Sequence, residues 1–149
     1  MRSNKLVMTI VLFFIVLSFV GCLEQKIGLS IKPEIYEYNL NMSSSPGIPL
    51  IAQFTRDLKN KGYKYHWVAE QGAFLKWQNE GKGRLEVLGN DIKTNEHKVY
   101  WVVDFDKEIK ETSFEVRLTI EEIDTGKVMY EASIQIDQQQ QGYFTIKEE

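Results

Sequence analysis

Cysteine is almost absent from this sequence: Cys22 is the only one among 149 residues. A single thiol excludes an internal disulfide, so a domain in this chain must rely on its hydrophobic core for stability. Histidine is scarce too, with only His66 and His97. A zinc or general-base site needs several such ligands close together, and no HExxH motif is present. The sequence therefore predicts no metal site and no cofactor.

An excess of positive charge is also lacking. The chain has 18 basic and 21 acidic residues, and its net charge of -3 becomes −5 if residues 1–21 are removed. Nucleic acids attract proteins through basic surfaces, and so do anionic lipids. We therefore expect no nucleic-acid partner. Any attachment to a membrane must use a device other than electrostatic docking.

The motifs of common catalytic sites are missing as well. There is no Gly-x-Ser-x-Gly, and Ser43–Ser45 lie in a sequence typical of a loop. Gly81–Gly83 is too short for a phosphate cradle. Asp104, Asp106 and Glu108 alternate in a way that could bind calcium, but the glycine and other ligands of a calcium loop are absent. We interpret them as a solvated strand end, and we expect no enzymatic activity.

What the sequence does have is a long apolar run at its start. Arg2 and Lys5 precede Leu6–Val20, which is apolar except for two residues. This order is typical of a secretory signal. A helix of 15 residues spans about 23 Å at ~1.5 Å per residue, which is short of the roughly 30 Å of a bilayer core. The run therefore favours an export signal over a permanent span.

The residues that close this run, "SFVGC", resemble the lipobox of bacterial lipoproteins. Phe19 departs from the leucine usual at its position in that family. The resemblance implies that the Cys22 thiol receives diacylglycerol and that a signal peptidase cleaves just before it. Two acyl chains are enough for stable anchoring. The implied location is the extracytoplasmic face of the cell membrane, with the membrane itself as one partner.

Two alternatives for the opening segment stay open. It could be an uncleaved anchor helix extended by Gly21–Leu23, or Cys22 could be an ordinary buried thiol. On the lipoprotein interpretation, residues 1–21 are a helical signal peptide, residues 22–32 a lipidated tether and residues 33–149 one folded domain.

The exported part is predicted to be all β. Phe114–Ile120 and Val128–Ile136 alternate apolar and polar residues around an Asp-Thr-Gly turn, which predicts a hairpin with one buried face. Pro33 indicates an edge strand or a strand start. Residues 50–61 are ambiguous between a helix and a short strand, Leu50–Phe54, followed by a loop; we favour the strand. About eight short strands predict an antiparallel sandwich.

Two stretches, "YHWVAEQG" and "SFEVRLTIEEIDTGKV", resemble immunoglobulin-like and polycystic-kidney-disease-type modules of cell surfaces. The first is similar to the strand with a core tryptophan, although "EQG" replaces the usual acidic-glycine turn. The resemblance implies an immunoglobulin-like β-sandwich that acts as a spacer or binding module.

Aromatic residues are plentiful in the middle strands and are the candidate binding residues. Buried, they would form the sandwich core; exposed, they could stack on sugars or anchor a protein. We expect Trp67 and Trp101 to be buried, because each shares its parity with other apolar residues. The candidates for a binding face are Trp77, Tyr100, Tyr63 and Tyr65.

These features lead to three functional hypotheses. The first is a non-catalytic module that binds an envelope protein. The second is binding of a glycan or wall polymer through exposed aromatics. The third is inhibition of an extracellular peptidase by loops such as "NMSSSPGIP" or "LGNDIKTNEH".

Overall fold

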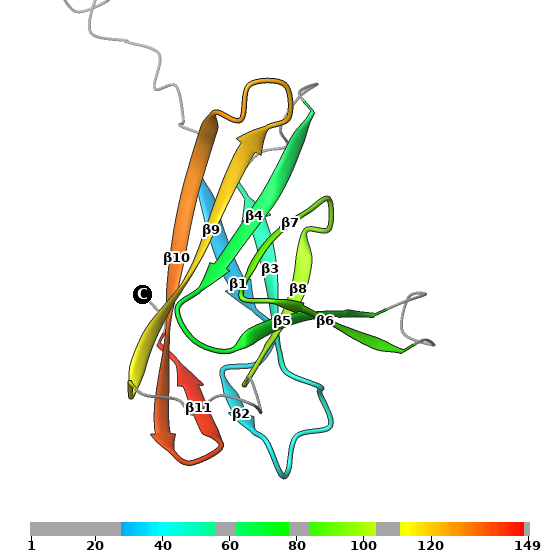
Figure 1. Ribbon diagram of the computed structural model, residues 1–149. Helices are drawn as coiled ribbons and strands as arrows, with labels where there is room; N and C mark the ends of the chain where they lie inside the picture. The colour runs from blue at the N-terminus through cyan, green and yellow to red at the C-terminus, as the bar shows by residue number, and fades with distance from the viewer. Residues whose placement is uncertain (1–27, 56–61, 78–83, 104–110, 148–149) are drawn as a thin grey trace, which may run out of the picture.

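Figure 1 shows the computed structural model of the chain, which describes residues 28–55, 62–77, 84–103 and 111–147. These residues form eleven β-strands and contain no helix. The strands are β1 Leu29–Pro33, β2 Glu37–Asn39, β3 Ile48–Phe54, β4 Tyr63–Ala69, β5 Ala73–Trp77, β6 Leu85–Gly89, β7 Asp91–Thr94, β8 Lys98–Val102, β9 Ser113–Glu122, β10 Val128–Gln140 and β11 Tyr143–Ile146.

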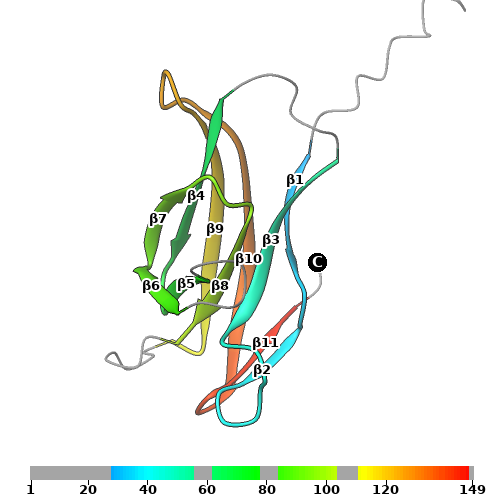
Figure 2. The same ribbon diagram turned by 90° about the vertical axis from the view of Figure 1, so that its right-hand side faces the viewer.

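The strands form two antiparallel sheets. Sheet A has the order β1-β3-β8-β5-β6, and sheet B has the order β2-β11-β10-β9-β4-β7. Figure 2 shows β9 and β10 in one layer and β3 in front of them in the other. The predicted all-β antiparallel sandwich is therefore confirmed.

The strand order is that of an immunoglobulin-like domain. Such domains place strands A, B, E and D in one sheet and strands G, F and C in the other. Here β1, β3, β8 and β5 follow the first order, while β10, β9 and β4 follow the second. The strand equivalent to C, β4, carries the fully buried Trp67, which is the position of the core tryptophan in that fold. Strands β2 and β11 extend sheet B beyond β10.

The core forms because alternate residues of facing strands are apolar. All four apolar residues of β9 at even positions are at most 1 % exposed, and they face buried residues of sheet A. Trp67 and Trp101 are both fully buried, as expected. The Trp101 indole Nε1–H donates a hydrogen bond of 2.8 Å to the carbonyl oxygen of Gln71, which satisfies its polar group inside the core.

Two glycines make turns that other residues would strain. Gly72 has a φ of 84° between β4 and β5, and a Cβ there would lie 2.5 Å from the Trp101 Nε1. Gly126 has a φ of 67° in the predicted turn between β9 and β10. Both angles lie in the left-handed region, where glycine has no steric penalty.

Several boundaries differ from the sequence predictions. Strand β1 begins at Leu29, so the last four residues of the expected tether pair with β3 in sheet A. Pro33 ends this edge strand, in agreement with its predicted edge position. Residues 50–54 belong to β3 and confirm the strand interpretation of that segment. The predicted loop "LGNDIKTNEH" is wrong in part, because Asp91–Thr94 pair with β4 as strand β7.

Other expectations lie outside the described residues. These are the signal segment with Cys22, the polar part of residues 56–61, and the carboxylates at 104–108. Within the described ranges, no helix is both long and apolar enough to cross a membrane.

Candidate functional site

The four candidate aromatics do not form one surface. Tyr63 and Tyr65 project from β4 into the sandwich, where their ring centroids are 5.5 Å apart. The Phe54 ring packs edge-on against Tyr63 at 6.1 Å and against Tyr130 at 6.3 Å. These four rings fill one end of the interior.

Tyr65 is only 7 % exposed, so its ring faces are not available for stacking on a ligand. Burial, together with a hydrogen bond and proximity to Tyr63, raises the pKa of the Tyr65 hydroxyl well above its usual range. The expected binding role of Tyr65 is therefore corrected to a packing role. Tyr65 lies on the same side of β4 as Trp67, and the facing sheet covers that side.

Tyr100, in contrast to Tyr63 and Tyr65, lies outside the sandwich interior, on the outer face of sheet A. It pairs with Leu75 of β5 and is partly buried, with the Lys98 Nζ 5.2 Å from its ring centroid. Trp77 follows Leu75 by two positions in β5, so its backbone position belongs to the same face. The side chain of Trp77 itself is outside the described part of the structure.

The outer face of sheet A holds an apolar pocket of about 500 Å³, here called the sheet A pocket. Three buried residues, Ala73, Leu75 and Val102, form an apolar cluster separate from the main core. The remaining lining is Tyr38, Leu40, Ser45, Pro46, Leu85, Val87 and Val103. Among these described lining residues no side chain carries a charge at neutral pH. The pocket can therefore accept an aliphatic or aromatic group.

The loop between β2 and β3 forms one wall of this pocket. The Tyr38 hydroxyl donates a hydrogen bond of 3.3 Å to the carbonyl oxygen of Pro46, which holds the loop over the strands. Val87 lies at the rim and is 69 % exposed. A buried floor with an exposed apolar rim is the usual form of a binding pocket.

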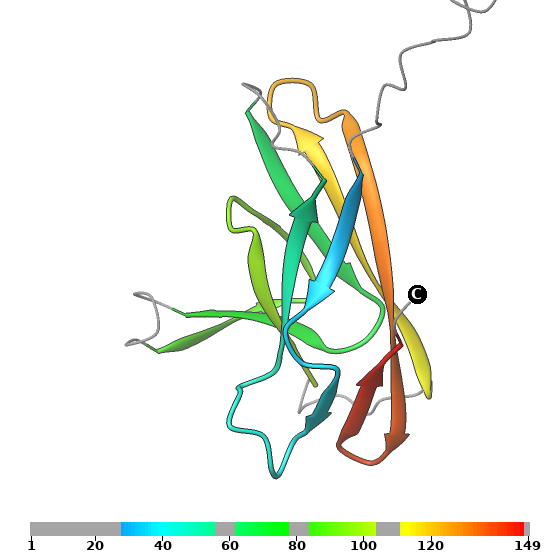
Figure 3. The same cartoon turned by 180° about the vertical axis from the view of Figure 1, so that it is seen from behind.

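The pocket and the start of the described chain lie toward opposite ends of the sandwich. Strand β1 begins at one end, here called the near end, and runs toward the other, the far end (Figure 3). The β2–β3 connection and the turn between β10 and β11 lie at the far end in Figures 1 and 3. The chain thus enters the domain away from the loop that walls the sheet A pocket.

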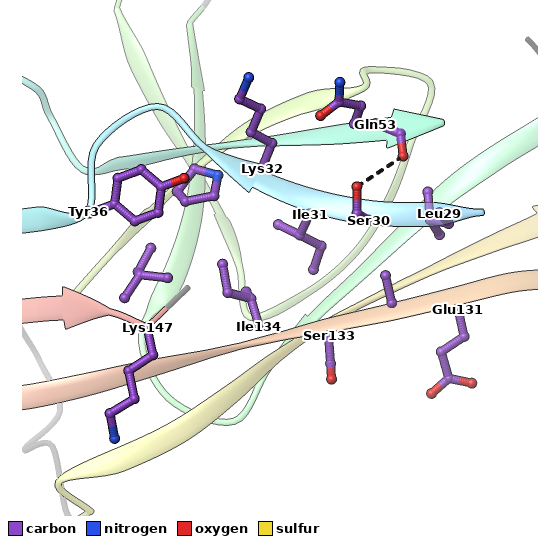
Figure 4. Close-up of a pocket in the computed structure, with 13 residues that line it drawn as sticks. Leu29, Ser30, Ile31, Lys32, Tyr36, Gln53, Glu131, Ser133, Ile134 and Lys147 are labelled. Carbon is purple, nitrogen blue, oxygen red and sulfur yellow. Dashed lines mark hydrogen bonds between the residues drawn. The ribbon is translucent and has the colours of Figure 1, made fainter. Parts of the chain in front are cut away.

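A second hollow, here called the edge groove, lies between β1 and β10 and measures about 620 Å³ (Figure 4). Ile31 and Ile134 point into the space between the two strands. Lys32 and Gln53 point away from it on the sheet A side, and Ser133 points away on the sheet B side. The groove is the open side of the sandwich, where the two sheets meet without hydrogen bonding to each other.

The outer face of sheet B carries a charge network instead of an apolar surface. The His66 Nδ1 lies 2.6 Å from a Glu121 carboxylate oxygen, and its Nε2 lies 2.8 Å from Asp91. Lys93 donates to the other Glu121 oxygen at 2.6 Å. His66 can donate to both carboxylates only when both ring nitrogens carry a proton. Hydrogen bonds from Lys93 and then His66 lower the pKa of Glu121.

This network ties the edge strand β7 to β4 and β9. It agrees with the prediction that His66 faces away from Trp67 and the core. Across the described segments, no group of three or more His, Cys, Asp or Glu side chains is arranged to hold a metal ion.

Comparison of the chain with protein-family profiles, with curated protein sequences and with solved structures found no match.

Sequence reasoning did not find the sheet A pocket, although a signal for it was present. Ala73, Leu75 and Trp77 share one parity of β5, and Leu85 and Val87 share one parity of β6. Both sets are apolar, while Phe74 on the other parity fills the core. Apolar residues on both faces of a strand indicate that each face is covered or binds something.

Proposed function

We propose that this protein is a lipid-anchored, extracytoplasmic binding module that holds an envelope protein through the sheet A pocket and catalyses no reaction. The observation that carries this proposal is the position of the pocket: an aliphatic recess walled by a loop at the far end of the sandwich, away from the chain's entry. The signal-like residues 6–22 supply the second part of the argument.

The anchor and the pocket fit together geometrically. Cys22 precedes Gly28 by six residues, so a lipidated tether reaches at most about 20 Å at ~3.4 Å per residue. The near end of the sandwich then stays close to the bilayer, and the far end projects into the envelope. A partner can reach the pocket without contacting the lipid surface.

The chemistry of the pocket suits a protein side chain as ligand. Interfaces draw most of their affinity from a few apolar anchors that fill desolvated pockets. Leu75 and Val102 provide a buried floor, and the exposed Val87 provides a rim that loses water on binding. The Lys98 ammonium near the Tyr100 ring adds a polar margin beside the apolar floor.

The rim residue gives a direct test. Val87→Asp places a charge at the pocket mouth without disturbing the core, because Val87 is 69 % exposed. Val128→Asp is the matched control, since Val128 is 49 % exposed in β10, outside the pocket lining. In affinity capture from envelope extract with the lipidated protein, the wild type and Val128→Asp should retain the same partner and Val87→Asp should lose it. Equal capture by both variants would contradict the proposal.

The anchor is tested by Cys22→Ala, with Ser18→Ala as the control within the same apolar run. The alanine at position 22 has no thiol for diacylglycerol, so we expect the protein to leave the membrane fraction or to persist as an uncleaved precursor. Ser18→Ala should be processed and anchored normally. Normal anchoring of the Cys22 variant would exclude the lipoprotein part of the proposal.

Glycan binding is the second candidate, and the position of Tyr100 favours it. Tyr100 and the backbone of Trp77 share the outer face of sheet A, and an exposed aromatic ring is the usual stacking surface for a sugar. Trp77→Ala should then abolish binding to wall polymers while affinity for the protein partner changes little. Binding of a protein but of no glycan would exclude glycan binding and favour binding of an envelope protein.

A further inference from the structure

The edge groove contains main-chain groups that have no strand partner. In the β9–β10 pair the Gln138 N–H donates to the Thr112 carbonyl at 2.7 Å. Antiparallel pairing alternates, so the even-numbered residues of β10 point their N–H and C=O toward β9. The N–H and C=O groups of Glu131, Ser133 and Gln135 therefore point out of the sheet edge.

Strand β11 covers only the second half of this edge. Its last residue, Ile146, lies opposite Ile136, and its pairing with β10 runs from there to Gln140. The β9–β10 register shifts between Val128 and Tyr130, which interrupts the regular ladder at the other end. On the side away from β9, six consecutive residues, 130–135, thus have no hydrogen-bonded strand among those described, although β1 packs nearby. Their length is about 20 Å at ~3.4 Å per residue.

Strand β1 faces the same opening but is better protected. The Thr55 N–H donates to the Gly28 carbonyl at 3.1 Å, and the Glu34 N–H donates to the Pro49 carbonyl at 3.0 Å. Leu29 and Ile31 consequently point their amides into the groove. Pro33 has no N–H to offer, and proline and lysine are the residues that natural proteins use to block edge pairing. The open edge is therefore that of β10.

We propose that the edge groove binds an extended segment of a partner protein, which pairs with residues 130–135 of β10 as an added strand in line with β11. An extended main chain supplies N–H and C=O groups at the spacing that the edge requires. Its inward side chains, at every second position, would be apolar because they meet Ile31 and Ile134.

Charged side chains set no condition on the segment. Glu131 is paired with Arg117 at 3.6 Å, and Lys147 is paired with Asp137 at 2.7 Å. The Lys32 side chain points away from the groove on the sheet A side. The segment is therefore selected by its extended main chain and by its apolar inward side chains.

A second copy of this chain is a poor occupant. Two copies of β10 paired about a two-fold axis at Ser133 would place residues 128–130 of one copy opposite 136–138 of the other. That position is already filled by β11. The register therefore selects a short segment of another protein, of about six residues.

The test uses Ser133→Pro in the full chain. This change removes one N–H that points into the groove and no bond to β9, so the fold should persist. Ser133→Ala keeps the N–H and is the matched control. The probe is a displayed library of peptides of about seven residues with alternating apolar and varied polar positions. Wild type and Ser133→Ala should enrich the same peptides with alternating apolar positions, and Ser133→Pro should bind them about tenfold or more weakly.

Two further measurements keep the test decisive if the proline variant folds poorly. N-methylation of the peptide amides that face β10 should abolish binding to the wild type, while methylation of the other amides should not. Hydrogen exchange at Glu131, Ser133 and Gln135 should slow when the peptide is added.

The proposal is overturned if no peptide is enriched, or if enriched peptides bind Ser133→Pro or the N-methylated series as tightly as the controls. Its outcome is separate from that of the sheet A pocket. Val87→Asp should bind the edge peptides normally, so loss of one surface leaves the other measurable.

Discussion

The outer faces of the two sheets differ in what they present to solvent. The face of sheet B carries a network in which His66 contacts Glu121 and Asp91, and Lys93 contacts Glu121. The face of sheet A, over β5, β6 and β8, carries aliphatic residues around a pocket without charged lining among the described residues. Both faces belong to antiparallel sheets with the same kind of backbone hydrogen bonding. Under the function proposed above, sheet B faces water and the partner covers the pocket on sheet A.

The largest expected effect comes from disrupting the hydrophobic core between the two sheets, because both outer faces depend on it. Trp101→Ala removes a fully buried indole that packs against Phe114 and Phe144, with ring centroids 5.2 Å away in each case. The free energy of unfolding should fall by about 3–5 kcal/mol, measured by urea denaturation. Binding at both surfaces should fail with it. Retention of either binding activity in a destabilised variant would show that the surface does not depend on the sandwich.

The next prediction separates the two faces. Leu75→Ala, in the floor of the sheet A pocket, should lower the free energy of unfolding by about 2 kcal/mol because the residue is 6 % exposed. It should also weaken capture of the partner. Thr119→Ala on the outer face of sheet B should change stability by less than about 0.5 kcal/mol and leave capture unchanged. Equal effects of the two substitutions on capture would remove the proposed difference between the faces.

A smaller effect concerns the charge network and its pH dependence. The pKa of Glu121 is lowered in the folded state, so its carboxylate stabilises the fold above its unfolded pKa near 4.5 and this contribution is lost as pH falls through the folded pKa. Glu121→Gln should therefore cost about 1 kcal/mol at neutral pH and nothing in strong acid. Thermal unfolding of both proteins from pH 7 to pH 2 checks this. Parallel curves at all pH values would show that the pairing contributes no stability.

The smallest effect is local. His66→Gln keeps a polar side chain but removes the double contact to Asp91 and Glu121. Among the described strands, β7 pairs with β4 alone, so its amides should exchange hydrogen faster, with little change in global stability. Exchange rates in β8 of sheet A are the internal control and should stay constant.

Local sequence pattern predicted the parts of the fold that depend on alternation. The hairpin of β9 and β10 was predicted because alternating apolar residues, four in the first strand and five in the second, flank the turn at Gly126. Strand β7 was missed because "DIKT" has a single apolar residue, Ile92, and reads as a polar loop. It forms a strand because β4 offers an edge and because Ile92 is buried beside Trp67.

The sites were predicted less well, for a physical reason. Parity placed Tyr63 and Tyr65 on one face of a strand and Tyr100 on one face of another. Trp67 lies on the same face of β4 and was expected to be buried, so parity already argued for a packing role of Tyr65. The lining of the sheet A pocket could not be predicted in this way, since it depends on pairings between distant strands. The edge groove is likewise non-local: it exists because β11 stops at Ile146 and because β1 pairs with β3 rather than with β10.

The central claim is that the anchored protein presents the sheet A pocket to an envelope partner. Site-specific photo-crosslinking in cells tests it most directly, with a photoreactive residue at Val87 and, for comparison, at Thr119 on sheet B. The account predicts one major adduct from position 87, none from position 119, and loss of the adduct when Cys22→Ala is combined with the probe. Equal crosslinking from both positions, or an adduct that persists without Cys22, would contradict it.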